Sequence, residues 1–488
     1  MISHSKRIKL LKHSGTLSLS AAVLLWSALT SADMPPRLFK IVELDPCPYE
    51  IDGLGEAGVD TPEQVASEST IIKDLHHAAA LGEMEAVKAL LYKGIAADIR
   101  DDQGRTPLML AAKNGHYKII KRLIIAGAGA NRTDNKGRTA MHYAAMGNHL
   151  RALNELKTYR GRINAEDNEG MTPLMCAAAT GQSLAVRQLL LPRSVNSRDR
   201  LGRTALFHAA SGGHRAVFRL LEKSGALDEF STNDGETILM AAARGGDKKL
   251  VAKLIRDGAI IKHTDKYGKT ALYIAAEAGH VKIVKLLIDK GADPLVVTKD
   301  GNTLLMAAAQ RGSLELIPIF IRAGVKMDAQ NSNGHTALWN AVIAKQSEVV
   351  QYLLKRNAKV TFKDKSNKTL LMLAVEKNDK ALVDILLEKG ARPNAKNDLG
   401  QTLLIQASLA GNAEIVGSLL AKGAKINVVA NDGTTVLMAA AEGGIYDFVR
   451  LLLSWGANPN TLNKRGKTAL DIATSKGHTS VITLLGGI

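Results

Sequence analysis

A threonine that recurs about every 33 residues is the feature that most constrains the fold of this 488-residue chain. Each of these threonines is followed two residues later by an apolar residue, usually Leu. They are Thr106, Thr139, Thr172, Thr204, Thr237, Thr270, Thr303, Thr336, Thr369, Thr402, Thr435 and Thr468. Every interval is 33 residues except the one from Thr172 to Thr204, which is 32. A fixed period of this length predicts a stacked array in which each unit contacts only its neighbours.

The unit at residues 265–297 shows how one repeat is expected to fold. Gly268 supplies a residue that tolerates positive φ in a tight turn, and Thr270 is expected to cap a short helix over residues 271–277. A second, amphipathic helix is expected to begin at His280. Neither helix can bury its apolar face alone, so the stability of the unit must come from the repeats on either side.

Two segments carry the repeat in its most recognisable form: GRTPLMLAAKNGH at residues 104–116 and GKTALYIAAEAGH at residues 268–280. This pattern resembles the ankyrin repeat, and the resemblance extends from about residue 71 to residue 488. It implies an all-α solenoid of helix-turn-helix units with short β-turn fingers, with about 13 repeats including the caps. Such an architecture does not by itself identify what is bound.

The repeat frame divides most of the chain into predicted units. Residues 71–100 lack the Gly-x-Thr turn but keep the helix pair, which indicates an N-terminal capping repeat, and residues 463–488 are polar enough for a C-terminal cap. Eleven repeats lie between them, at residues 101–133, 134–166, 167–198, 199–231, 232–264, 265–297, 298–330, 331–363, 364–396, 397–429 and 430–462. Lys345-Gln346 replaces the usual Gly-His, and Asn367 replaces a turn Gly, so the shape of these two loops is in question.

The first 32 residues are typical of a secretory signal. Four basic residues precede an apolar run at residues 17–29, and the small residues 30–32 offer a cleavage site before Asp33. The run is short for a transmembrane helix, and an uncleaved anchor or a disordered basic tail are the alternatives. We therefore predict export, with the periplasm as the favoured destination and secretion as the alternative.

Charge is distributed unevenly along the chain, which has a formal net charge of +17. Residues 1–32 carry +4 and residues 33–70 carry −7, so the repeats carry +20. The acidic segment contains Pro and Gly and has no sustained helical period, which predicts an extended arm. The positive charge of the repeats favours an acidic partner without identifying it.

A second period of about 66 residues is superimposed on the first. Three residues after the turn threonine, alternate repeats carry Met109, Met175, Met240, Met306, Met372 and Met438. The repeats between them carry His142, Phe207, Tyr273, Trp339, Ile405 and Asp471. Methionines can form an adaptable ligand stripe, but packing between repeats is the favoured interpretation here.

The resemblance to ankyrin repeats implies binding through the turn tips and the adjoining surface of the first helix. The tips supply Lys136, Arg138, Arg200, Arg203, Lys266, Tyr267, Lys269, Lys464 and Arg465. The ends of the first helices supply Lys113, Asn114, Arg244, Glu277, Gln310, Arg311, Glu376 and Lys377. Arg244, Tyr267 and Arg311 are the strongest candidates, because Tyr and Arg dominate binding energy when desolvated. Each of the others could equally be a solvated surface charge.

No catalytic, cofactor-binding or metal site is predicted. The chain has no GxSxG nucleophile motif and no GxxxxGK[ST] phosphate loop. Residues 53–58 match GxGxxG, but the strand and helix that a dinucleotide site needs do not flank them. Five histidines recur at one position of the repeat, where they are expected to start the second helix: His116, His149, His214, His280 and His478. No Cys or carboxylate recurs with them as a second metal ligand.

These patterns together predict a non-enzymatic scaffold that binds a protein partner through its tips and concave first-helix surface after export. The alternative from a different class is a basic surface that binds anionic envelope lipid, polysaccharide or nucleic acid. Nucleic acid is disfavoured because acidic tips alternate with basic or apolar ones. A secreted effector that acts on host proteins is a further alternative, and membrane contact is expected only through an uncleaved signal.

Overall fold

The structure is a computed structural model that describes residues 68–192, 194–227 and 231–487, with side chains from residue 75 onward. The predicted signal at residues 1–32 lies outside the described residues, as does nearly all of the predicted arm. In the described part of the chain, no helix is both long and apolar enough to cross a membrane.

The boundary of the arm, predicted at residue 70, is corrected by the first described helix. Helix α2 (Glu68–Leu81) includes the last three residues of the segment that was predicted to be extended. The prediction started from the apolar pattern that begins at Ile71. A helix needs an N-terminal turn before the residues that bury its apolar face, so its first residues precede that pattern.

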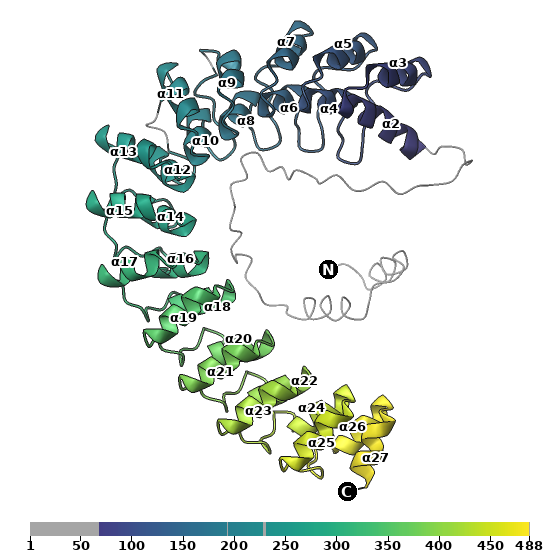
Figure 1. Ribbon diagram of the computed structural model, residues 1–488, viewed down its shortest axis with the longest axis vertical. Helices are drawn as coiled ribbons and strands as arrows, with labels where there is room; N and C mark the ends of the chain where they lie inside the picture. Colours follow the sequence, from purple (N-terminus) through teal and green to yellow (C-terminus); the bar gives the residue numbers. More distant parts are fainter. Residues whose placement is uncertain (1–67, 193, 228–230, 488) are drawn as a thin grey trace. The chain divides into compact units, whose positions relative to one another are not determined.

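Thirteen helix pairs follow one another along the described residues, and each pair consists of a first and a second helix (Figure 1). The first helices are α2, α4 (Pro107–Lys113), α6 (Ala140–Met146), α8 (Pro173–Ala179), α10 (Ala205–Ser211), α12 (Ile238–Gly245), α14 (Ala271–Ala278), α16 (Leu304–Arg311), α18 (Ala337–Ile343), α20 (Leu370–Glu376), α22 (Leu403–Leu409), α24 (Val436–Gly443) and α26 (Ala469–Lys476). The second helices are α3 (Met84–Tyr92), α5 (Tyr117–Ile125), α7 (Leu150–Thr158), α9 (Ser183–Leu189), α11 (Arg215–Lys223), α13 (Lys248–Arg256), α15 (Val281–Asp289), α17 (Leu316–Arg322), α19 (Ser347–Lys355), α21 (Lys380–Glu388), α23 (Ala413–Ala421), α25 (Tyr446–Ser454) and α27 (Thr479–Gly486). The predicted all-α solenoid is confirmed, and the described residues contain only isolated β-bridges, at Lys363–Thr369 and Lys396–Thr402.

The turn threonine begins each first helix as expected. Thr270 has an extended backbone, and its hydroxyl oxygen accepts a hydrogen bond from the backbone nitrogen of Tyr273 at 3.2 Å. This bond satisfies one of the N–H groups that the first turn of a helix leaves unpaired. In α4 and α8 a proline follows the threonine, where its missing N–H costs nothing.

The alternating methionines add a second hydrogen bond to this cap, from the N-cap backbone back to the third residue of the helix. In six repeats the Met sulfur accepts a hydrogen bond from the backbone nitrogen of the turn threonine at 3.4 or 3.5 Å. His142 does the same through Nδ1 at 3.1 Å, and Asp471 through a carboxylate oxygen at 2.7 Å. All six methionines are at most 2 % exposed. The favoured interpretation of packing is therefore confirmed, and the stripe is closed to a ligand.

Recurring histidines join each repeat to the one before it. The Nε2 atom of His280 lies 2.9 Å from the carbonyl oxygen of Arg244, near the end of the preceding first helix. His116, His149, His214 and His478 make the corresponding bond at 2.8–3.0 Å. All five occupy the N-cap of a second helix, as predicted. They therefore satisfy helix C-terminal carbonyls across each boundary.

Consecutive first helices pack closely because most of them carry two adjacent alanines, such as Ala275-Ala276 in α14, both fully buried. Valine takes the second alanine position at Val342 in α18 and at Val375 in α20. These two helices make few contacts with each other, whereas their neighbours pack more closely. A β-branched side chain is bulkier than Ala, so this boundary cannot close as far as the others.

The two unusual loops keep the backbone of the glycines that they replace. Lys345 and Asn367 both have φ of +57°, in the left-handed region that glycine normally occupies. Gln346 stands in place of His and extends its side-chain nitrogen to within 3.4 Å of the carbonyl oxygen of Gln310. The repeat geometry therefore dictates these conformations even where the residues are unfavourable.

Candidate functional site

The turn tips are held rigid by the polar residue that starts each of them. One carboxylate oxygen of Asp265 accepts hydrogen bonds from the backbone nitrogens of Tyr267 at 2.9 Å and Lys269 at 2.8 Å. The backbone nitrogen of Lys266 donates to the carbonyl oxygen of Asp234 in the preceding tip at 2.8 Å. The side chains at the tips are therefore displayed from a fixed, hydrogen-bonded row.

Tyr267 is the large apolar side chain exposed at this part of the row, with 45 % of its surface accessible. The ammonium of Lys266 lies 5.0 Å from the centre of its ring and also forms an ion pair with Asp234. The hydrogen bond with Asp234 and the contact with Tyr267 raise the pKa of Lys266. A stacked aromatic ring and a cation at one tip are typical of a protein-binding anchor.

Charged side chains at the ends of the first helices are paired within their own repeat. Arg244 binds Glu236 through both terminal nitrogens, and Lys269 binds both carboxylate oxygens of Glu277 at 2.9 and 3.0 Å. Lys368 and Glu376 form the same pair at 3.1 Å. In each case the two residues are eight positions apart, so the pair ties the tip to the end of the first helix. Four predicted residues, Arg244, Lys269, Glu277 and Glu376, are thus held in these pairs.

Two predicted tip residues point into the protein instead. Arg138 has a side chain only 4 % exposed and forms an ion pair at 2.7 Å with the fully buried carboxylate of Asp134. Arg203 is 11 % exposed and binds Asp199 at the same distance. A partner cannot reach guanidinium groups in these positions, so we remove both residues from the candidate surface.

The buried acids of these two repeats each bind one more polar side chain. The hydroxyl of Tyr143 donates to Asp134 at 2.7 Å, and Nε2 of His208 lies 2.9 Å from Asp199. Burial lowers the pKa of His208, so the ring is neutral and donates a hydrogen bond. Burial raises the pKa of Asp199, but the bond from His208 and the charge of Arg203 outweigh it and lower that pKa. These networks are structural and lie beneath the surface.

The remaining predicted residues are at the surface but are not all close together. Asn114 donates a hydrogen bond to the carbonyl oxygen of Ala80 at 2.7 Å, so its amide joins two repeats. Gln310 is half-buried, and the exposed residues are Lys113, Lys136, Arg200, Arg311, Lys377, Lys464 and Arg465. Arg311 and Gln310 lie at the end of α16, which packs against α14 of the repeat that carries Tyr267, and α14 packs in turn against α12, which carries Arg244. The others belong to other repeats. We call Arg244, Lys266, Tyr267, Lys269, Glu277 and Arg311 the tip surface.

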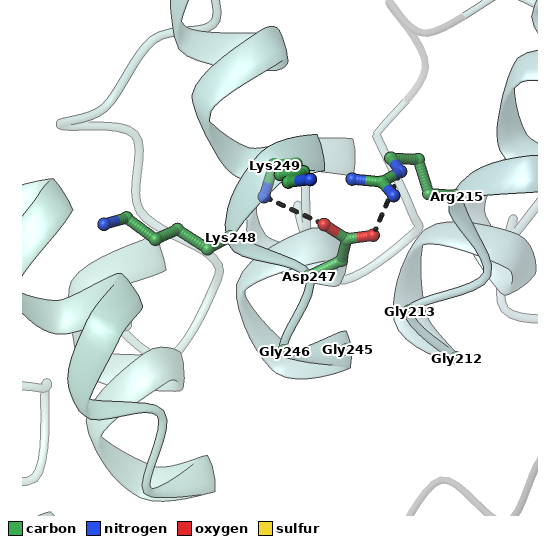
Figure 2. Close-up of a pocket in the computed structure, with 8 residues that line it drawn as sticks. All are labelled: Gly212, Gly213, Arg215, Gly245, Gly246, Asp247, Lys248 and Lys249. Atoms are coloured by element: carbon green, nitrogen blue, oxygen red, sulfur yellow. Dashed lines mark hydrogen bonds and ion pairs between the residues drawn. The ribbon is translucent and has the colours of Figure 1, made fainter.

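The sequence analysis missed a basic region on the second helices. A cavity between the starts of α11 and α13 is bordered by Arg215, Asp247, Lys248 and Lys249 and by two pairs of glycines (Figure 2). Figure 2 shows the carboxylate of Asp247 between Arg215 and Lys249, with Lys248 directed away from them. The signal was present as Lys and Arg recurring in successive second helices.

In the described part of the chain, no group of three or more His, Cys, Asp or Glu side chains could hold a metal ion. The recurring histidines use Nε2 for their carbonyl bonds and lie in separate repeats. His142 is buried, which lowers its pKa, and both of its ring nitrogens are hydrogen-bonded.

The geometry defines a helical repeat protein that displays a row of rigid turn tips. A family model described as ankyrin repeats in three copies matches residues 75–167, 147–228, 224–298, 293–364, 358–430 and 404–487. The chain therefore belongs to the ankyrin-repeat family, whose members generally mediate protein–protein interaction and are typically not enzymes. Comparison with curated proteins gives no significant match.

Proposed function

We propose that this protein is a non-enzymatic scaffold that binds a folded protein partner through the tip surface. The exposed ring of Tyr267 is the observation that carries the proposal, because the cation beside it, Lys266, is held by an ion pair with Asp234. Ion pairs also hold Arg244 in the preceding repeat and Lys269 in the same repeat. An aromatic anchor surrounded by ordered charges loses little side-chain entropy on binding. The ring would enter a pocket on the partner, with the charges forming the rim.

The charges of the tip surface also indicate which charges a partner would present. Arg244 and Lys269 are already neutralised by Glu236 and Glu277, so the surface carries both signs in alternation. Arg311 is exposed and makes no ion pair with any described residue. A partner that places a carboxylate opposite Arg311 fits best, whereas a uniform track of phosphates would meet Glu236 and Glu277.

We further propose that binding occurs after export, with the periplasm as the favoured compartment. The support is the sequence of residues 1–32, where basic residues precede an apolar run and small residues. Mass measurement of the protein purified from the extracytoplasmic fraction tests this proposal. A mature N-terminus near residue 33 is expected, and an intact N-terminus in the cytoplasmic fraction would contradict it.

Photo-crosslinking in living cells tests the tip surface. A photoreactive amino acid replaces Tyr267 or Arg311, and a control probe replaces Lys355, which is exposed on α19. We expect both tip probes to capture the same protein, the control probe to miss it, and Arg311→Ala to reduce capture from position 267. Equal capture from position 355 would contradict the proposal. Capture of lipid, glycan or nucleic acid, with binding that falls steeply as salt rises, would favour the basic-surface alternative.

A further inference from the structure

The second helices α11, α13 and α15 form a concentrated basic face. From N-cap to C-cap these three helices contain ten Lys and Arg residues and four acidic residues. The matching segments of α17, α19 and α21 contain five of each. The excess of cations is therefore not shared by the second helices that follow, although α5 also carries three cations and no acidic residue.

This face contains a groove of about 470 Å³. Its rim carries Arg219, Lys249, Arg256 and Lys290, all exposed, and its floor includes the half-buried side chains of Ile255 and Leu286. Cations thus surround an apolar strip. The groove can take a ligand that combines negative charge with aliphatic groups.

The four rim cations are not neutralised within the described residues. Lys253 also lines the groove, but its ammonium pairs with the carboxylates of Glu222 at 2.5 Å and Asp257 at 2.6 Å. The guanidinium of Arg215 lies 3.6 Å from a carboxylate oxygen of Asp247. Arg219, Lys249, Arg256 and Lys290 form no ion pair in the part of the chain that the structure describes. Carboxylates on a ligand would therefore meet uncompensated positive charge.

The neighbouring cavity in Figure 2 marks where this site ends. Asp247 occupies it, accepting a hydrogen bond from the backbone nitrogen of Lys249 at 2.8 Å and pairing with Arg215. An anion entering there would displace or face this carboxylate. Of the four rim cations, Arg219, Arg256 and Lys290 border the groove and not this cavity.

We propose that this basic groove binds an acidic amphipathic segment of another polypeptide. Aliphatic side chains of the segment would cover the floor at Ile255 and Leu286, and its carboxylates would pair with the rim. A flat bilayer fits less well, because the apolar residues lie below the cations rather than projecting beyond them. A single-stranded nucleic acid fits less well, because no lining residue is aromatic and the groove therefore lacks the aromatic platform on which successive bases stack.

This inference is independent of the tip surface, which is built from tips and first helices. The groove is built from the second layer of the array (Figure 1). One copy of the chain could therefore hold two different polypeptides. Loss of either interaction would leave the other in place.

Fluorescence anisotropy with the full chain tests the proposal. The probe is a labelled helical peptide of Glu, Leu and Ala that presents Leu on one face and Glu beside it, and a scrambled version keeps the composition but disperses the Leu residues. The test variant is Arg219→Glu/Lys249→Glu/Arg256→Glu. The control variant is Lys355→Glu/Arg356→Glu/Lys389→Glu, which reverses three exposed cations on α19 and at the ends of α19 and α21.

We expect the test variant to bind the peptide at least about tenfold more weakly and the control variant to stay within about twofold of the original chain. Ile255→Gln should also weaken binding, and the scrambled peptide should bind more weakly than the amphipathic one. If the triple reversal does not fold, as judged by circular dichroism, the Gln triple at the same positions replaces it. Equal losses in both triples, or equal binding of the two peptides, would overturn the proposal. Displacement of the peptide by oligothymidylate or by phosphatidylglycerol vesicles at lower concentration than by unlabelled peptide would also overturn it.

Discussion

The imidazole of His280 donates a hydrogen bond from Nε2 to the carbonyl oxygen of Arg244, 2.9 Å away in the preceding repeat. A carbonyl oxygen can only accept, so the proton of the neutral ring is on Nε2. Gly246 lies against the same ring, and a Cβ added to it would be 2.7 Å from Cε1 of His280. The absence of a side chain on Gly246 therefore makes room for the histidine of the next repeat.

The same pairing recurs along the chain. Each of the five recurring histidines is preceded, one repeat earlier, by a glycine: Gly82, Gly115, Gly181, Gly246 and Gly444. Where this position holds Asn148, Lys345 or Asn378, the next repeat has Gln182, Asp379 or Asn412 in place of histidine. The ring and the space left by the glycine thus occur together at these five boundaries, although Gly213, Gly279, Gly312 and Gly411 precede residues other than histidine.

A double-mutant cycle on Gly246 and His280 tests this relationship. His280→Ala removes one hydrogen bond and should cost about 1 kcal/mol. Gly246→Ala should cost more, because φ is +79° and the methyl group meets the ring. In the His280→Ala background the clash disappears and only the backbone strain of Gly246→Ala remains. The double variant should therefore lose about 1 kcal/mol less stability than the sum of the two single variants.

Hydrogen exchange of amides in α12 and α15 is the suitable readout, because long repeat arrays do not unfold in one step. Gln346→Ala serves as the control, since its bond to Gln310 is 3.4 Å long and should contribute less. Strictly additive costs for Gly246→Ala and His280→Ala would contradict the pairing.

Local chemistry explains why the architecture could be predicted from the sequence. The threonine cap and the positive-φ glycine each require a particular residue type at a particular place, so a period in those residues is a period in structure. Where Asn148, Lys345 and Asn378 replace the glycine before the second helix, the backbone keeps a φ of +57° or +58°. The array imposes the conformation where the residue alone would not.

Whether the cation at a tip reaches the surface depends on which carboxylate of the same repeat it pairs with, and the turn sequence alone does not contain that information. Lys269 and Lys368 find Glu277 and Glu376 eight residues later, whereas Arg138 and Arg203 have Met146 and Ser211 at that place. These arginines turn instead to Asp134 and Asp199, four residues earlier, and become buried. In these four repeats the residue eight positions on distinguishes a tip cation that pairs along the first helix from one that turns inward.

Lys345→Gly should stabilise the chain by about 0.5–1 kcal/mol. Lysine has a steric cost at a φ of +57°, which glycine does not, although glycine offsets part of the gain through unfolded-state entropy. Asn378→Gly is the matched substitution at the same position one repeat later, and its gain should be smaller because Asn tolerates this conformation. Hydrogen exchange in α18 and α19 measures the first effect and in α20 and α21 the second. Loss of protection in Lys345→Gly would show that its side chain makes a contact that outweighs the strain.

His208→Tyr should reduce the sensitivity of the chain to mild acid. The pKa of His208 is lowered by burial, so the folded state binds its proton less readily than the unfolded state. Its contribution to stability is complete above the unfolded pKa of about 6.5 and is lost as the pH falls through the lowered folded pKa. Tyr143 occupies the equivalent place, donates to Asp134 at 2.7 Å, and has its pKa raised by burial, so tyrosine keeps the hydrogen bond without titrating in this range.

The free energy of opening, measured by hydrogen exchange in α10 between pH 7.5 and pH 5, should therefore fall less steeply with decreasing pH in His208→Tyr than in the original chain. The two slopes should differ by up to about 1.4 kcal/mol per pH unit, which corresponds to a difference of one bound proton between the folded and unfolded states. The reciprocal change, Tyr143→His, should make α6 more sensitive over the same range, because it places a second histidine beside a buried aspartate. His142 is present in both variants and contributes acid sensitivity of the same sign, so it does not affect the comparison. The pKa of Asp199 is itself lowered, so its own contribution persists until the pH falls well below this window. An unchanged slope in His208→Tyr would mean that the buried imidazole accepts a proton in the folded state as readily as in the unfolded chain.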